Sequence, residues 1–270
     1  MKNLTVVPYA GLCNRLNSIV CALQYKTKHP NVDVKIFWFK YFHCNCRFDD
    51  LFKQLPPPYP HVQELGFGVK NRPGTKFNFY IPDKLRFLWY DCVITPSHNA
   101  DRFEDYTKEK ERVYVYKDNR FCFAEPDYNV SRFFQPVDDI QKRINEVTKD
   151  WNGNVIGLHI RRTDNTLAIK NTPIEHFYNI IDKELSIDKN AKFYLATDDD
   201  YVKIELKKRY GEHTIISPKL TLKRNSVRGM KDAVLDLFCL ASTKKIYGSC
   251  ASTYSLFASH LFGRELITKV

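Results

Sequence analysis

The chain of 270 residues contains no run of about 18 apolar residues, which is the length that a helix needs to cross a membrane. Its first residues, MKNLTVVPYAGL, lack the long apolar stretch and the small-residue cleavage site of a secretory signal peptide. We therefore expect neither a transmembrane helix nor a signal peptide, and we expect a cytoplasmic location.

Two nucleotide-binding signatures are also absent. The sequence has no G-x-G-x-x-G fingerprint and no G-x-x-x-x-G-K-[ST] loop, which argues against NAD chemistry and against P-loop chemistry. It has no repeat at solenoid spacing and no long low-complexity tract. These absences leave a globular protein without a glycine-rich phosphate loop.

The eight cysteines do not form a metal-binding pattern. HCNC at 43–46 has no second ligand pair at zinc-finger spacing, so no metal site is expected. Without a secretory signal, the cysteines are expected to be reduced thiols. Four of them fall within apolar patterns and are expected in the core: Cys13, Cys21, Cys239 and Cys250.

Positive charge is in excess. The chain has 42 Lys and Arg against 31 Asp and Glu, a formal net charge of +11, which favours an anionic partner. The short runs KEKER (108–112) and KLTLKR (219–224) are the densest clusters, whereas nucleic-acid-binding proteins usually concentrate their basic charge. We expect no nucleic-acid partner. A phosphorylated small molecule fits, and a basic surface also permits peripheral contact with a lipid-linked glycan at the inner membrane face.

Hydrophobic periodicity predicts an α/β fold. The opening reads as strand 4–9, loop 11–15, a helix with Leu16, Ile19 and Leu23 on one face, and strand 32–39. From residue 154 onward, strands and helices alternate as βαβαβαβα. This pattern predicts two Rossmann-like, doubly wound parallel-sheet domains that face a cleft, an acceptor-side domain at 1–130 and a nucleotide-sugar domain at 131–270. Residues 61–110 are rich in aromatics and show only weak periodicity.

Polar residues gather at the expected carboxyl ends of four strands, where ligands bind in such folds. The GLCNR loop supplies Asn14 and Arg15. The strand 155–160 runs into the sequence RRTD, and the strand ending at Thr197 runs into Asp198 and Asp199. The last strand leads to a helix that begins near Ser252 and Thr253.

These residue types suit a nucleoside diphosphate. A helix N-terminus and arginine side chains both bind phosphate. Asp198 or Asp199 would repel a diphosphate, but either carboxylate could accept two hydrogen bonds from guanine. Each feature also has a structural explanation: an ion pair at a domain interface, a capped helix, or a turn with a surface arginine.

Four segments in order resemble one family. HIRRTD (159–164) resembles the signature of the α-1,6-fucosyltransferase and protein O-fucosyltransferase superfamily, which includes bacterial members. GLCNR, FYLATDD (193–199) and the run from Asp232 to Ala258 are similar to its other motifs. The resemblance covers 154–262 well and 4–24 moderately.

This resemblance implies a GT-B-type inverting transferase that uses GDP-fucose and needs no metal or other cofactor. Catalytic roles would fall to His159, Arg161 and Asp164, with Arg161 on the β-phosphate. Donor contacts would come from these residues: Asn14, Arg15, His159, Arg161, Arg162, Asp198, Asp199, Ser252 and Thr253. The acceptor would be a glycan.

The sequence departs from the core α-1,6 enzymes after RRTD. Those enzymes carry Lys next and Glu four positions beyond it, and here the positions hold Asn165 and Ile169. The motif therefore assigns neither the linkage nor the general base. Two alternatives stay open: a transferase of the same fold that uses GDP-mannose or a UDP-sugar, and a non-catalytic nucleotide-sugar or nucleic-acid binding module.

Overall fold

A computed structural model describes residues 1–64, 83–122, 125–163, 165–217, 221 and 223–268. The chain divides into two compact units. Unit 1 comprises residues 1–126, 132–137 and 223–231, and unit 2 comprises residues 127–131, 138–222 and 232–270. Within the described residues, no helix combines the length and the apolar character needed to span a bilayer.

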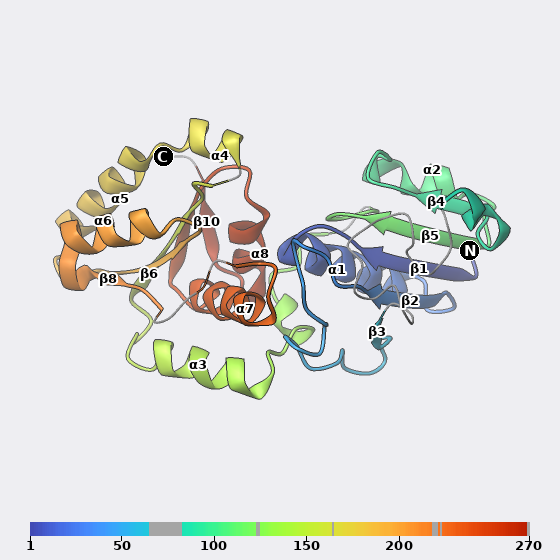
Figure 1. The fold of residues 1–270 in the computed structure, drawn as a ribbon, viewed down its shortest axis with the longest axis horizontal. Coiled ribbons are helices and arrows are strands. Elements are labelled where there is room, and N and C mark those ends of the chain that lie inside the picture. The colour runs from blue at the N-terminus through green and yellow to red at the C-terminus, as the bar shows by residue number, and fades with distance from the viewer. Residues whose placement is uncertain (65–82, 123–124, 164, 218–220, 222, 269–270) are drawn as a thin grey trace. The chain divides into compact units, whose positions relative to one another are not determined.

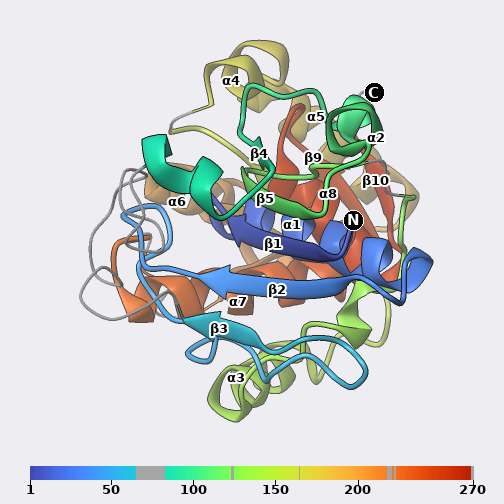
Figure 2. The ribbon, with the colours of Figure 1, turned by 90° about the vertical axis from the view of Figure 1, so that its right-hand side faces the viewer.

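Unit 1 is an open parallel sheet with helices. Its described strands lie in the order β3-β2-β1-β5-β4, and each pairs in parallel with its neighbour. Figure 2 shows them side by side in this order, with α1 behind. The elements are β1 (Asn3–Pro8), α1 (Leu12–Lys28), β2 (Asp33–Trp38), β3 (Val62–Glu64), η2 (Asp83–Leu88), β4 (Cys92–Ile94), η3 (Ala100–Arg102), α2 (Phe103–Thr107) and β5 (Arg112–Lys117).

Unit 2 repeats the same architecture. Its described strands lie in the order β10-β9-β6-β7-β8, again all parallel. After η4 (Val130–Arg132), the elements are α3 (Asp138–Thr148), β6 (Val155–Ile160), α4 (Thr166–Asn171), α5 (Ile174–Ile187), β7 (Lys192–Thr197), α6 (Asp200–Tyr210), η5 (Gly211–His213), β8 (Thr214–Ile215), α7 (Val227–Ala241), β9 (Lys245–Gly248), α8 (Thr253–Phe262) and β10 (Glu265–Ile267). The first residues of α7, up to residue 231, belong to unit 1.

Helices cover both faces of the sheet in unit 2 (Figure 1). On one face, alternate residues of β6 and β7, among them Leu158 and Leu195, join a buried cluster with α5 and α6. On the other face, the end of α7 and Thr243 just beyond it approach β6 so closely that a Cβ on Gly157 would lie 2.6 Å from Thr243 Oγ1. Because both faces are buried, the strands are almost continuously apolar, as parallel strands usually are.

The predicted fold class is confirmed, since each unit contains a parallel sheet with helices. In unit 2, one short helix and one short strand were not predicted: α4 has six residues and β10 has three. In unit 1, β3, β4 and α2 were not predicted either. Elements this short carry too few residues to show a hydrophobic period. Of the four cysteines expected in the core, Cys13, Cys21 and Cys239 are buried, whereas Cys250 is half-buried in the loop after β9. That expectation was wrong for Cys250.

Substitution of Gly157 by alanine tests how closely α7 packs against the sheet. A methyl group there would also lie 2.8 Å from Leu240 Cδ1, and Thr243 Oγ1 is itself held by a 2.7 Å hydrogen bond to the carbonyl of Leu240. We expect Gly157→Ala to lower the free energy of unfolding by about 1–3 kcal/mol through overpacking. Urea denaturation followed by circular dichroism measures this.

Gly11→Ala is the matched control, because a Cβ at Gly11 meets no atom within 4 Å. It should cost less than about 1 kcal/mol, through a weaker cap on α1. An equal loss of stability in both variants would contradict the packing argument.

Candidate active site

The site lies at the carboxyl edge of the sheet in unit 2, where β6 neighbours β9. The chain runs outward from β6 to β7 and β8 on one side, and β9 and β10 lie on the other. Such a reversal of strand order is a topological switch point, and ligands of doubly wound sheets bind there. The residues that follow β6 and β9 therefore border the expected ligand position.

The two strand ends are joined by hydrogen bonds. The backbone N–H of Arg161 donates to Ser249 Oγ at 3.0 Å, and the N–H of Ser249 donates to the carbonyl of His159 at 2.9 Å. Ser249 is fully buried. It fixes the path of the backbone as the chain leaves β6, so the position of Arg161 is set from the β9 side.

Asp198 holds the same turn from the β7 side. Its carboxylate accepts the N–H of Arg162 at 2.7 Å and the hydroxyl of Thr163 at 2.5 Å, and it forms a 2.8 Å ion pair with Arg161 Nη1. The side chains of Arg161 and Asp198 are only 18% and 13% exposed. Asp198 thus orients Arg161, the cation for which the family resemblance predicts a catalytic role.

The electrostatics of Asp198 favour its charged form. Burial by itself would raise the pKa of Asp198, but the Thr163 hydroxyl, the Arg161 charge and the N–H groups of Arg162 and Thr163 outweigh it and lower the pKa. The carboxylate is therefore ionised near neutral pH, and it pairs with a cation that is itself always charged.

Arg162 is anchored inside unit 2. Its Nη2 donates to the carbonyl of Thr172 at 2.7 Å, and the hydroxyl of Thr172 accepts the N–H of Cys250 at 3.1 Å. Burial lowers the pKa of Arg162, and the nearby carboxylates of Glu175 and Asp198 oppose that shift. Thr172 thus connects Arg162 to the loop before α8.

The N-terminus of α8 faces this loop. Ser252 is its N-cap residue and makes no side-chain capping bond, and Thr253 begins the helix. A Cβ on Gly248 would lie 2.7 Å from Ser255 Oγ, so glycine lets the first turn of α8 lie directly against the end of β9. Backbone N–H groups and the helix dipole make such a terminus favourable for an anion.

His159 lies behind the strand end. It is 4% exposed, and its ring stacks on Tyr254 at a centroid distance of 5.0 Å. The Tyr254 hydroxyl donates to the carbonyl of Ala233 at 2.8 Å, which fixes the stack between β6 and α8. The structure therefore places the imidazole in the interior of unit 2.

The acidic run after β7 serves three purposes. Asp198 holds the arginine turn. Asp199 caps α6, since its Oδ1 accepts the N–H of Tyr201 at 2.8 Å, and Asp200 pairs with Lys203 at 2.8 Å. Asp199 is therefore a helix cap, as its structural explanation expected. Recognition of guanine by Asp198 or Asp199 stays a prediction.

The GLCNR loop belongs to unit 1. Arg15 is completely buried: Nε donates to the carbonyl of Ala10 at 2.9 Å, Nη1 donates to the carbonyl of Phe39 at 2.6 Å, and the guanidinium lies 4.7 Å from the centre of the Trp38 ring. Arg15 thus ties the loop to the end of β2. Asn14, in the first turn of α1, is half-buried.

Asp164 lies outside the described residues. The next residue, Asn165, occupies the position where the core α-1,6 enzymes carry Lys, and here it caps α4: Oδ1 accepts the N–H of Ala168 at 3.0 Å. Its Nδ2 donates to the carbonyl of Ala251 at 3.0 Å. Asn165 therefore links α4 to the loop before α8.

The sequence did not predict the hydrogen bonds that Thr172 and Asp236 make inside unit 2. Thr172 precedes Pro173 in a segment that reads as an ordinary helix start. Asp236 lies in α7, where it accepts a hydrogen bond from the buried Tyr194 hydroxyl, and burial raises the pKa of Asp236 to about 7. Asp236 falls at a core position of the helical period. The one signal in the sequence was therefore a carboxylate at a position where an apolar residue is expected.

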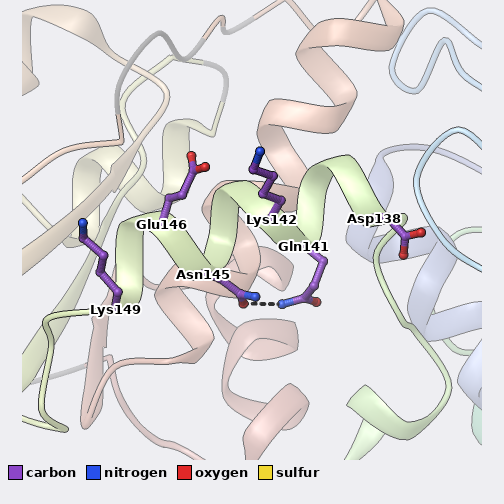
Figure 3. Close-up of a pocket in the computed structure, with 6 residues that line it drawn as sticks. All are labelled: Asp138, Gln141, Lys142, Asn145, Glu146 and Lys149. Atoms are coloured by element: carbon purple, nitrogen blue, oxygen red, sulfur yellow. Dashed lines mark hydrogen bonds between the residues drawn. The ribbon is translucent and has the colours of Figure 1, made fainter.

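A shallow pocket elsewhere in unit 2 is not a catalytic site. Its volume is about 470 Å³. Figure 3 shows the residues that line it along α3: Asp138, Gln141, Lys142, Asn145, Glu146 and Lys149. Five of the six residues belong to α3 and Lys149 directly follows it, and they include charges of both signs, as on a solvated surface. In the described part of the chain, no group of His, Cys, Asp and Glu side chains could hold a metal ion.

Solved structures of fucosyltransferases share this fold. NodZ α-1,6-fucosyltransferase soaked with GDP-fucose matches with a TM-score of 0.64 and 16% identity, over 99% of this chain and 95% of its own. A FUT1 variant from Arabidopsis thaliana in complex with GDP matches with a TM-score of 0.62 and 14% identity, over 98% and 69%. POFUT1 in complex with GDP matches with a TM-score of 0.54 and 10% identity, over 97% and 95%.

No protein-family model matches the sequence, and no curated protein does. At these identities the structural likeness establishes the fold. It confirms the GT-B-like fold class of two Rossmann-like units, and the proteins that share it are the fucosyltransferases that the motifs resemble.

Asp198→Asn tests the clamp on the arginine turn. The amide keeps the size but loses the charge, and we expect a loss of about 1–3 kcal/mol in unfolding free energy at pH 7. Since the folded-state pKa of Asp198 is lowered, its stabilisation is complete above the unfolded pKa of about 4 and is lost as the pH falls through the folded value. The difference between wild type and variant should therefore be constant from pH 5 to 7 and shrink toward pH 3.

Thermal unfolding between pH 3 and pH 7 measures that difference. Asp199→Asn is the control, because Asn caps a helix as well as Asp and the change should stay within about 0.5 kcal/mol. A difference that grows toward pH 3 would be the wrong sign for a carboxylate held in its charged form.

Proposed function

We propose that this chain is an inverting glycosyltransferase that transfers fucose from GDP-fucose to a glycan acceptor without a metal ion. One observation carries the proposal. Arg161 is fixed on both sides at the switch point, beside the loop that leads into the N-terminus of α8. The same fold occurs in NodZ soaked with GDP-fucose and in POFUT1 in complex with GDP.

The chemistry follows from the charge that develops. The bond between the anomeric carbon and the β-phosphate oxygen breaks, both electrons stay on the phosphate, and the sugar becomes oxocarbenium-like. Arg161 and the backbone N–H groups at Ser252 and Thr253 stabilise that growing negative charge, which is usually the largest catalytic contribution. The acceptor hydroxyl attacks from the opposite face, so the configuration at the anomeric carbon inverts.

A base must accept the proton that the acceptor hydroxyl loses. Asp164 is one proposed base, and the departing phosphate is the other. A weak base suffices where departure of GDP precedes attack, because the acceptor hydroxyl is then acidified by bonding to the sugar cation. The position at which the core α-1,6 enzymes carry Lys holds Asn165, whose side chain is engaged in capping α4.

Guanine recognition is proposed for the acidic turn. Asp198 already accepts bonds on both oxygens from the turn 161–163. Asp199 uses Oδ1 to cap α6. We therefore propose Asp199, rather than Asp198, as the carboxylate that accepts hydrogen bonds from guanine N1–H and N2–H₂. This pair of donors distinguishes GDP from UDP, so a UDP-sugar is the less favoured alternative donor.

Further donor contacts are part of the same proposal. Arg162 and His159 position the arginine turn from inside unit 2, and Asn14 offers a side-chain amide from unit 1. Arg15 donates from Nε and Nη1 to backbone carbonyls that hold the GLCNR loop, and its proposed donor contact would use Nη2. Unit 1 is proposed to carry the acceptor, which would be a glycan.

Arg161→Ala tests the assignment. Calorimetry with GDP, UDP and GDP-fucose in EDTA should show binding of the two guanine ligands by the wild type, much weaker binding of UDP, and a sharp loss in the variant. The rate of GDP release from GDP-fucose with an acceptor panel should fall about 10²–10³-fold, as when one oxyanion donor is removed.

Arg209→Ala is the control, since Arg209 is half-exposed on the outer face of α6 and pairs with Asp182 at 3.5 Å. It should leave binding and rate unchanged. Equal affinity for GDP and UDP would refute guanine recognition, and binding only after EDTA is replaced by a divalent metal would refute metal independence.

Peripheral membrane contact is proposed for unit 1. Three consecutive apolar side chains at the end of η2 and just beyond it are exposed: Phe87 by 67%, Leu88 by 55% and Trp89 by 49%. Large apolar side chains in a row on the surface indicate an interaction site. With a net charge of +11, an anionic bilayer that presents a lipid-linked glycan is the proposed partner.

Phe87→Ser should lower the affinity for vesicles of phosphatidylglycerol and phosphatidylcholine, measured by co-sedimentation, by about tenfold. That is the effect expected when one aromatic side chain is no longer buried in the bilayer. Ile187→Ser is the control, because Ile187 is 74% exposed at the end of α5 in unit 2. Equal weakening by both changes, or no sedimentation of the wild type, would remove the membrane from the proposal.

A further inference from the structure

Two cysteines that are distant in the sequence meet inside unit 1. Cys21 lies in α1 and Cys122 lies beyond β5, and their Sγ atoms are 2.7 Å apart. Cys21 is 0% exposed and Cys122 is 4% exposed. Their separation approaches the S–S bond length of about 2.05 Å, so a disulfide requires only a small further approach of the two sulfurs.

The surrounding backbone fixes the pair. The N–H of Cys122 donates to Cys21 Sγ at 3.4 Å, and the Cys21 thiol lies 3.7 Å from the carbonyl of Cys122. The segment around Cys122 is tied to α1 on both sides. The N–H of Asn119 donates to the carbonyl of Asn14 at 3.1 Å, and Gln24 Nε2 donates to the carbonyl of Glu125 at 3.0 Å.

The other close pair has a different geometry. Cys44 and Cys46 are buried with their Sγ atoms 3.9 Å apart, but only one residue separates them. A disulfide across so short a loop distorts the preferred dihedral angles. The backbone there is also engaged, because Trp38 Nε1 donates to the carbonyl of Cys46 at 2.9 Å. This pair serves as an internal comparison.

We propose that Cys21 and Cys122 are a redox site whose reversible disulfide fastens the chain segment after β5 onto α1. The oxidant is a low-molecular-weight disulfide such as glutathione disulfide. One protein thiol loses its proton, and the thiolate attacks the small disulfide, forming a mixed disulfide and releasing one small thiolate. The second protein thiolate then attacks the protein sulfur of the mixed disulfide and releases the other.

The balance of this exchange is simple. Two protein S–H bonds are lost and one S–S bond forms, while the small disulfide is reduced to two thiols that take up the two protons. The closed loop spans about 100 residues, for which a cross-link removes much of the conformational freedom of the unfolded chain. The inference does not depend on the proposed transferase activity, because it concerns α1 and the segment after β5 alone.

The wild-type protein itself provides the test. Native protein is equilibrated in glutathione buffers of increasing oxidation, alkylated with N-ethylmaleimide and digested with trypsin. Cleavage after Arg15, Lys26, Arg120 and Arg132 gives the peptides 16–26 and 121–132, each with a single cysteine. We expect these two peptides to become linked as oxidation increases, and the midpoint of thermal unfolding to rise by about 5–10 °C and to return after dithiothreitol.

Variants separate this link from the neighbouring pair. Cys122→Ser should abolish the linked peptide and the rise in unfolding temperature, whereas Cys44→Ser should retain both. Full alkylation of Cys21 and Cys122 in the most oxidising buffer, while the half-buried Cys92 becomes glutathionylated, would overturn the proposal. So would a link that forms only in urea, because the folded structure would then not be its cause.

Discussion

The ion pair between Asp198 and Arg161 is the interaction on which the site depends. A guanidinium at the end of β6 is useful to a leaving phosphate only if it is held in place before the charge develops. Asp198 supplies that constraint, because one carboxylate binds the side chain of Arg161 and two donors of the turn that follows. Ser249 pins the same turn from the neighbouring strand.

In this arrangement a largely buried carboxylate orients the cation that is proposed to bind the phosphate of the donor. The lowered pKa of Asp198 keeps the pair intact near neutral pH. The pair leaves Arg161 partly exposed, so the guanidinium can still contact a ligand. The N-terminus of α8 adds backbone donors without any further charged side chain. Fixed charge and a helix dipole are thus the means by which the proposed transferase would support the loss of a diphosphate.

Several residues of the motifs have structural tasks that a motif cannot separate from ligand contacts. Arg15 is buried against Trp38 and holds a loop, Asp199 caps α6, and Asn165 caps α4. Each of these residues is a good candidate for a ligand contact by type and position. The role of each side chain depends on the partner that it contacts in the fold. For Arg15 that partner, Trp38, is distant in the sequence.

The sequence by itself determined the fold class, most of the helices and strands of unit 2, and the strand ends at which the site residues lie, because periodicity and turn residues act locally. It also predicted that Arg161 and the start of α8 belong to the site. Only the tertiary structure decided that Asp198 holds the arginine turn, that Ser249 supports it from β9, and that Cys21 meets Cys122. These contacts join residues 35 to 101 positions apart. No local pattern encodes them, since they depend on how the elements are arranged around the parallel sheets.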